Sequence, residues 1–110
     1  MNGINRGAIT IVPKDPFYDW VDSTDPQHPF PREMKSFNTY LIEDDFVEEE
    51  KMIKKYFKQI FENELLGMWT DPNDWPKVRS FKVFKEWFDY YVSGLVMDLR
   101  RRGITYDDYG

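Results

Sequence analysis

The chain has 110 residues, a formal net charge of −5, one histidine and no cysteine. This length fits a single domain around one hydrophobic core, and the negative charge argues against nucleic acid or a membrane surface as a partner. The lack of cysteine excludes disulfides, thiolate nucleophiles and thiolate metal sites, and it leads us to expect a cytoplasmic protein.

The first part of the chain predicts a strand, a short helix and a loop. Residues 8–12 alternate with β-branched side chains and stop at a proline, which is typical of a strand. Residues 15–21 start with Asp15 and Pro16 and predict a short helix. Residues 23–31 contain three prolines, and we expect them to form the most mobile surface loop.

The middle of the chain predicts a second strand and a long helix. Residues 37–43 alternate as a strand does, with apolar side chains on both faces. Residues 45–66 predict the helix, which begins with a capping box at Asp45 and Glu48 and ends at Gly67. Its apolar stripe consists of Phe46, Ile53, Tyr56, Phe57, Ile60, Phe61 and Leu65.

The last third allows two interpretations. Apolar residues at helical spacing permit one helix over residues 80–103. Tyr90, Tyr91 and the interior Gly94 favour instead a short helix over residues 80–88 and a strand over residues 89–99, with Gly94 at a bulge or a close backbone approach. We favour the second interpretation because two strands alone make a marginal sheet. A short strand or turn can follow Ile104.

These elements predict one α+β domain over residues 1–110. We expect a small, mainly antiparallel sheet of three or more strands with one long and two short helices on one face, forming a single compact pair of layers.

Several segments resemble a family of small, functionally uncharacterised bacterial proteins. They are residues 1–5 leading into 8–11, 38–42, 75–76, 86–88 and 96–99, so that the resemblance spans nearly the whole chain. It implies a compact α+β domain and supports the extended form of residues 89–99. It brings no activity, cofactor or catalytic residue. The arginines at 100–102 depart from that family.

Candidate catalytic residues are few. Ser23, Asp25 and His28 are the residue types of a hydrolase triad, but one proline-rich loop cannot hold them in register, and we read them as a solvated turn. The six glycines show no phosphate-loop spacing, so that no nucleotide cofactor is expected. We therefore predict no catalytic residue, no metal site and no cofactor, and favour a non-enzymatic protein.

Acidic residues offer two further candidates. The first is a run at the start of the long helix, which fits helix-start solvation, a protein-facing patch or, last, a metal site: Glu43, Asp44, Asp45, Glu48, Glu49 and Glu50. The second is formed by Asp71, Asp74 and Asp98, which would converge if the loop near residue 71 covered the last strand. A small hydrolase or metal-assisted enzyme using these three aspartates is the enzymatic alternative.

Arg100, Arg101 and Arg102 precede Tyr106 and Tyr109, a composition found in proteins that grip single strands of nucleic acid. Two aspartates between the tyrosines offset most of that charge. We interpret the segment as a solvated end.

The chain carries 9 Phe, 4 Trp and 7 Tyr, more rings than periodic core positions explain. Tyr and Trp anchor protein interfaces, and an acidic rim selects a basic partner. We predict a protein-binding module, adaptor-like or immunity-like, or a self-associating protein. Its predicted interaction surface is Trp20, Phe30, Trp69, Asp71, Asp74 and Trp75. A small-ligand binder with an aromatic-walled pocket is a further alternative.

Overall fold

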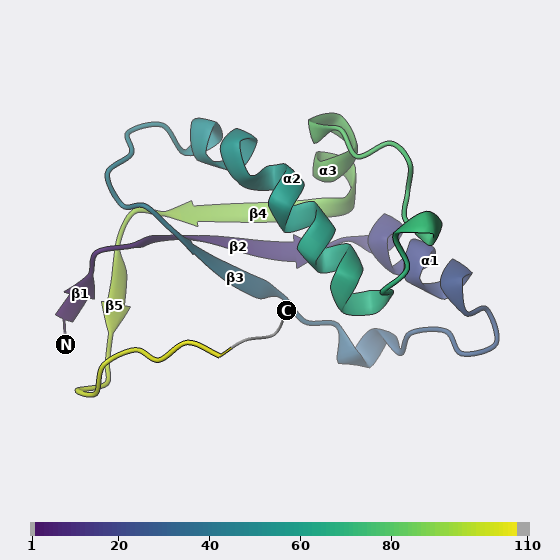
Figure 1. The fold of residues 1–110 in the computed structure, drawn as a ribbon, viewed down its shortest axis with the longest axis horizontal. Coiled ribbons are helices and arrows are strands. Elements are labelled where there is room, and N and C mark those ends of the chain that lie inside the picture. The colour runs from purple at the N-terminus through teal and green to yellow at the C-terminus, as the bar shows by residue number, and fades with distance from the viewer. Residues whose placement is uncertain (1, 108–110) are drawn as a thin grey trace.

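Three antiparallel strands form the central sheet, in the order β3-β2-β4 (Figure 1). The computed structural model describes residues 2–107. Its central strands are β2 (Gly7–Pro13), β3 (Asn38–Ile42) and β4 (Phe88–Ser93). Ile9 pairs with Tyr40 on one side and with Val92 on the other. The α+β class and the antiparallel sheet are therefore as predicted.

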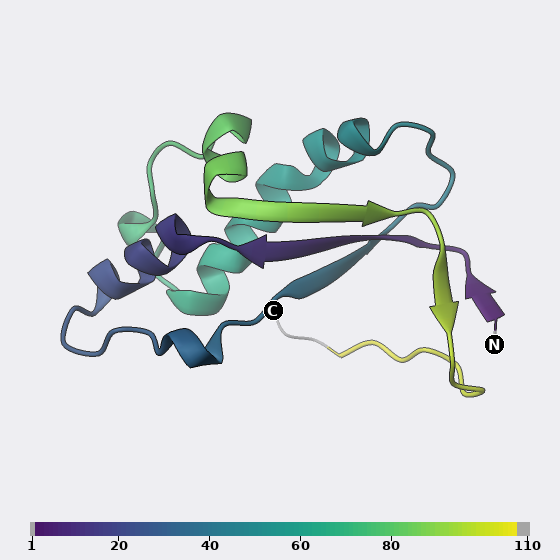
Figure 2. The same cartoon turned by 180° about the vertical axis from the view of Figure 1, so that it is seen from behind.

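One long and two short helices accompany this sheet, also as predicted. They are α1 (Asp15–Thr24), α2 (Glu49–Met68) and α3 (Phe81–Trp87), with single 3₁₀ turns η1 (Arg32–Met34) and η2 (Pro72–Asp74) in the connections. α2 crosses one face of the sheet, and Figure 2 shows the opposite face with no helix in front of it. No helix within residues 2–107 is both long enough and apolar enough to cross a membrane.

Aromatic rings fill the space between α2 and the sheet. Phe61 of α2 lies 5.8 Å from Phe84 and 5.4 Å from Phe88 between ring centroids, and all three side chains are fully buried. Edge-to-face and tilted ring pairs of this kind add stability beyond the area that they bury. The buried core comprises Ile9, Ile11, Phe17, Tyr18, Ile42, Met52, Ile53, Phe57, Ile60, Phe61, Leu65, Phe84 and Phe88.

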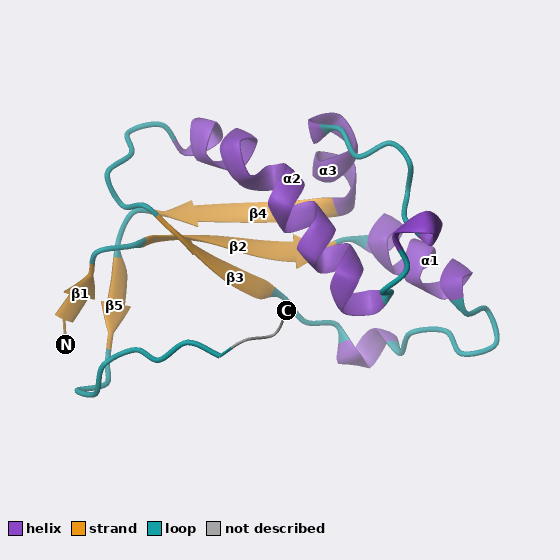
Figure 3. Ribbon diagram, in the orientation of Figure 1, coloured by secondary structure: helices purple, strands orange, loops and turns teal. Residues whose placement is uncertain are grey.

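A second, two-stranded sheet extends the β2–β4 ladder after a bend. β1 (Asn2–Ile4) pairs with β5 (Val96–Asp98) antiparallel, and the two form the arm seen beside the central sheet in Figure 3. At the bend Gly7 admits no side chain, because a Cβ there would lie 2.7 Å from the Ser93 carbonyl oxygen. The close backbone approach predicted at Gly94 is therefore at Gly7, whereas a Cβ on Gly94 would meet only an ordinary contact at 3.7 Å.

The last third follows the favoured prediction in part. A short helix, α3, is followed by a strand, and a single helix over residues 80–103 is wrong. The strand predicted over residues 89–99 is in fact two strands in two sheets, because the chain bends at Gly94 and Leu95. Residues 99–107 are exposed and form no strand, and Asp108 and Tyr109 lie outside the described residues.

The ends of the long helix differ from the prediction. α2 begins at Glu49, and Glu48 makes no side-chain capping bond, so the capping box at Asp45 is wrong. Phe46 packs on the core from the preceding loop instead of from the helix. Gly67 lies inside the helix without a positive φ, and the Trp69 N–H closes the last turn on the Leu65 carbonyl oxygen.

Candidate functional site

The predicted interaction surface is partly drawn together by hydrogen bonds from indole groups. Trp20 Nε1–H donates to the Asp74 carbonyl oxygen at 3.0 Å, and Trp69 Nε1–H donates to Asp74 Oδ2 at 2.9 Å. Trp75 Nε1–H donates to the Trp69 carbonyl oxygen at 2.8 Å. All three rings are partly buried. Their polar atoms therefore fix the loop around η2 against α1.

The aspartates of the enzymatic alternative do not converge. Asp71 Oδ1 accepts from the Asn73 N–H at 3.0 Å and caps η2, which is the turn role expected of it. Asp98 belongs to β5, at the opposite end of the molecule from η2 (Figure 1). Within residues 2–107 no three His, Asp or Glu side chains are arranged to hold a metal ion.

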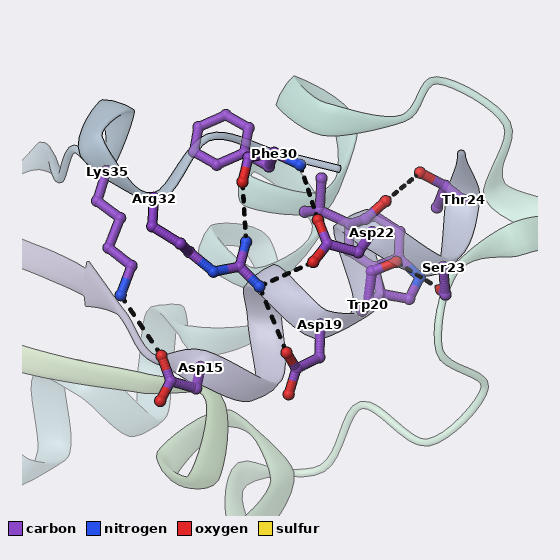
Figure 4. Close-up of polar contacts among 10 residues, drawn as sticks. Asp15, Asp19, Trp20, Asp22, Ser23, Thr24, Phe30, Arg32 and Lys35 are labelled. Carbon is purple, nitrogen blue, oxygen red and sulfur yellow. Dashed lines mark hydrogen bonds and ion pairs between the residues drawn. The ribbon is translucent and has the colours of Figure 1, made fainter. Parts of the chain in front are cut away.

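Phe30, the remaining predicted residue, lies in a loop that is tied to α1. Its N–H donates to Asp22 Oδ1 at 2.8 Å, and Arg32 donates to Asp22 Oδ2 at 2.8 Å (Figure 4). The Phe30 ring stacks on Tyr18 at 5.3 Å. The Phe30 N–H and the Arg32 guanidinium lower the pKa of the Asp22 carboxyl. The segment predicted to be most mobile, residues 23–31, is thus anchored at its far end, because Asp22 accepts from Phe30 within it and from Arg32 directly after it.

Ser23, Asp25 and His28 form no triad. The Ser23 hydroxyl donates to the Trp20 carbonyl oxygen, one turn back in α1, at 2.5 Å. His28 Nδ1 lies 3.1 Å from Asp25 Oδ2 on the surface. The hydroxyl and the imidazole do not contact each other, in keeping with a solvated turn.

The acidic run spreads over the β3–α2 loop and the start of α2, and it is only partly engaged. Glu43 accepts from the Tyr56 hydroxyl and from Lys55 Nζ at 3.0 Å, and these donors, Tyr56 first, lower the pKa of the Glu43 carboxyl. Glu50 accepts from the Tyr90 hydroxyl at 2.9 Å. Asp44 and Asp45 are exposed and form no ion pair within the described part of the chain.

A groove of about 540 Å³ lies between β3 and α2, and we call it the β3–α2 groove. Three consecutive strand residues form one wall, residues of α2 form the other, and Trp75 also lines the groove. The lining residues are Tyr40, Leu41, Ile42, Tyr56, Gln59, Ile60, Glu62, Asn63, Leu66 and Trp75. Rings, aliphatic side chains and two amides thus face one space.

A buried carboxylate fixes the walls of the groove relative to each other. Glu64 of α2 is 5% exposed and accepts from Asn38 Nδ2 at 2.8 Å and from the Tyr40 hydroxyl. Asn63 Nδ2 donates to the same hydroxyl at 2.9 Å. Burial, followed by the hydrogen bond to Glu64, raises the pKa of Tyr40 well above 10. The Tyr40 hydroxyl therefore stays protonated and holds the strand against the helix.

The strand wall is also a free sheet edge. β3 pairs only with β2 in the part of the chain that the structure describes. In an antiparallel strand, alternate residues point their N–H and C=O away from the paired neighbour. The groove therefore offers backbone donors and acceptors beside its apolar walls.

The sequence prediction located only Trp75 of the residues that line this groove. The others were assigned to the second strand or to the long helix, and nothing in the periodicity predicted the strand order. The signal that was present is the pair of amides, Gln59 and Asn63, one helical turn apart on the long helix.

Comparison of the chain with protein-family models, with curated proteins and with solved structures found no match in any of the three. The resemblance to a bacterial family therefore stays a prediction.

Proposed function

We propose that the protein binds another polypeptide, and that the β3–α2 groove receives an extended segment of it by strand addition. The observation that carries this proposal is a free strand edge that forms one wall of an aromatic-lined groove. An added strand would gain backbone hydrogen bonds from β3, while its alternate side chains would enter the groove.

The lining chemistry supports a peptide occupant. The amides of Gln59 and Asn63 lie on exposed positions of α2, and beyond the bond that Asn63 donates to Tyr40 they can hydrogen-bond a peptide backbone. Tyr56 and Trp75 offer ring faces for side chains. Glu64, in contrast, has its carboxylate engaged by Asn38 and Tyr40, so its role is to hold the walls in place.

This proposal keeps the predicted class of function, a non-enzymatic adaptor-like or immunity-like module, and moves the binding surface from the η2 loop to its neighbour, with Trp75 common to both. A cytoplasmic location remains an expectation that rests on the lack of cysteine.

A library of random ten-residue peptides displayed on phage tests the proposal. We expect selection on the wild-type protein to enrich peptides with alternating apolar residues that no longer bind Gln59→Trp, which fills the groove. Lys51→Trp, on an exposed position of α2 outside the lining, is the matched control and should bind them normally. Enriched peptides that bind both variants equally, or no enrichment, would contradict the proposal.

The aromatic walls also favour a second candidate, a small-ligand binder. Tyr40, Tyr56 and Trp75 line the groove, and its volume lies within the range of small-molecule sites. A screen of aromatic fragments by ligand-observed NMR separates the two candidates. A small-ligand site would bind fragments that Gln59→Trp no longer binds, and the phage selection would enrich no peptide.

A further inference from the structure

The apolar side chains of residues 99–107 are not buried against the rest of the chain. Every residue in this segment is exposed, including Leu99 (77%), Ile104 (52%) and Tyr106 (84%). Ile104, Thr105 and Tyr106 are strong strand formers. The segment thus has the composition of a strand but has no strand beside it.

The arginines of the same segment, Arg100, Arg101 and Arg102, are exposed and have no ion-pair partner among the described residues. Asp44 and Asp45, which likewise form no ion pair with described residues, follow shortly after Ile42, the last residue of β3 and part of the groove lining. The basic segment and the acidic loop are therefore complementary.

We propose that the occupant of the β3–α2 groove is residues 99–107 of a second copy of this chain, added antiparallel to β3. This inference rests on the function proposed above and names the partner. Two copies related by a two-fold axis can exchange their segments reciprocally, which makes a closed dimer.

The charges select the antiparallel direction. In that direction the arginines come first, beside Asp44 and Asp45, and the following residues run along β3 toward Asn38. Ile104 and Tyr106 are two residues apart, so both side chains lie on one face of the added strand. That face can meet the groove lining of Tyr40, Ile60 and Leu66.

Light scattering of the full chain with charge-reversed variants tests this proposal. We expect the wild type to show twice the mass of the 13.4 kDa chain at micromolar concentration. Reversing the basic segment (Arg100→Glu, Arg101→Glu, Arg102→Glu) should return the mass of a single chain, and so should Asp44→Lys with Asp45→Lys. Mixing these two variants should restore association, because each supplies the charge that the other needs. Lys77→Glu with Lys82→Glu, on exposed positions elsewhere, should leave the dimer intact.

Each other outcome is decisive. A wild type that stays a single chain at all concentrations would overturn the inference, and so would a dimer that neither reversal weakens. Protection of the amides of residues 103–106 from hydrogen exchange in a protein with the mass of one chain would show the segment folding back on its own sheet, which also overturns it. Peptide binding that Gln59→Trp abolishes, in a protein that does not dimerise, would leave the proposed function standing while the inference fails.

Discussion

Tyr40 on β3 and Glu64 on α2 are joined by a hydrogen bond from the tyrosine hydroxyl to the glutamate carboxylate. Glu64 is the one buried charged residue within residues 2–107. A buried carboxylate is tolerated only when donors satisfy it, and here the donors come from the strand that forms the groove's other wall. If β3 moved away from α2, the Glu64 carboxylate would lose its donors, so these hydrogen bonds keep the two walls of the groove at a fixed spacing.

Tyr40→Phe is expected to destabilise the protein by about 2 kcal/mol, because it removes a hydrogen bond to a charged, buried acceptor. Urea unfolding of the variant and the wild type measures this difference. Tyr91→Phe is the matched control, since Tyr91 is 64% exposed and should change stability little. Equal losses from both substitutions would contradict the assignment.

The hydrogen bond between Tyr40 and Glu64 predicts that the protein loses stability at alkaline pH. The pKa of Tyr40 is raised above its ordinary value of 10.0, chiefly by burial. A raised pKa in the folded state gives a stabilisation that is complete below pH 10 and is lost as the pH rises toward the folded value. The difference in stability between the wild type and Tyr40→Phe should therefore narrow above pH 10, and thermal unfolding between pH 8 and 11 would measure it.

Asp22→Asn is expected to release the loop of residues 25–31 and to lower the melting temperature at neutral pH. The Asp22 pKa is lowered from 3.8 by the Phe30 N–H and by Arg32. A lowered pKa gives a stabilisation that is present above pH 4 and disappears as the pH falls through the folded value. The melting temperatures of wild type and variant should thus converge in acid. Asp44→Asn is the control, because the Asp44 carboxyl has no ion-pair partner in the described residues. The difference in melting temperature between this variant and the wild type should not shrink in acid.

Local sequence patterns predicted the helices and strands of this fold well. They failed where a contact between residues far apart in the sequence determines where an element begins or ends. β2 could be predicted because its alternation and its terminal proline are local features. The start of α2 could not, because Phe46 continues the helical stripe in sequence while it packs from a loop. The split of residues 89–99 at Gly94 depends on the pairing of β5 with β1, at the other end of the chain.

The candidate site was harder to predict than the fold. The rings of Trp20 and Trp69 lie beside proline and aspartate in the sequence and suggested exposed anchors. Their N–H groups in fact bond to Asp74, a partner 54 residues from Trp20. The groove exists because β3 is at an edge, and strand order is a property of the whole topology.

A glycine pair allows a matched test of the backbone bend. Gly7→Ala places a Cβ 2.7 Å from the Ser93 carbonyl oxygen and 3.0 Å from the Glu43 carbonyl oxygen, so that backbone must move. We expect a loss of about 1–3 kcal/mol, as for other overpacked sites. Gly67→Ala, inside α2 with open space around it, should instead stabilise the protein by about 0.5–1 kcal/mol. Urea unfolding measures both, and a Gly7→Ala variant as stable as the wild type would show that the bend tolerates a side chain.

Asp74→Ala tests whether the tryptophan cluster is structural. It removes the carboxylate that accepts from Trp69 Nε1–H but leaves the main-chain oxygen that accepts from Trp20. We expect a loss of about 1 kcal/mol and a change in the near-ultraviolet circular dichroism of the tryptophans. Asp74→Asn retains a side-chain oxygen acceptor and should recover most of both signals. If Asp74→Asn loses as much stability and changes the circular dichroism as much as Asp74→Ala, the negative charge of Asp74 matters and its role as a hydrogen-bond acceptor does not. That result would contradict a purely structural role for the hydrogen bond from Trp69.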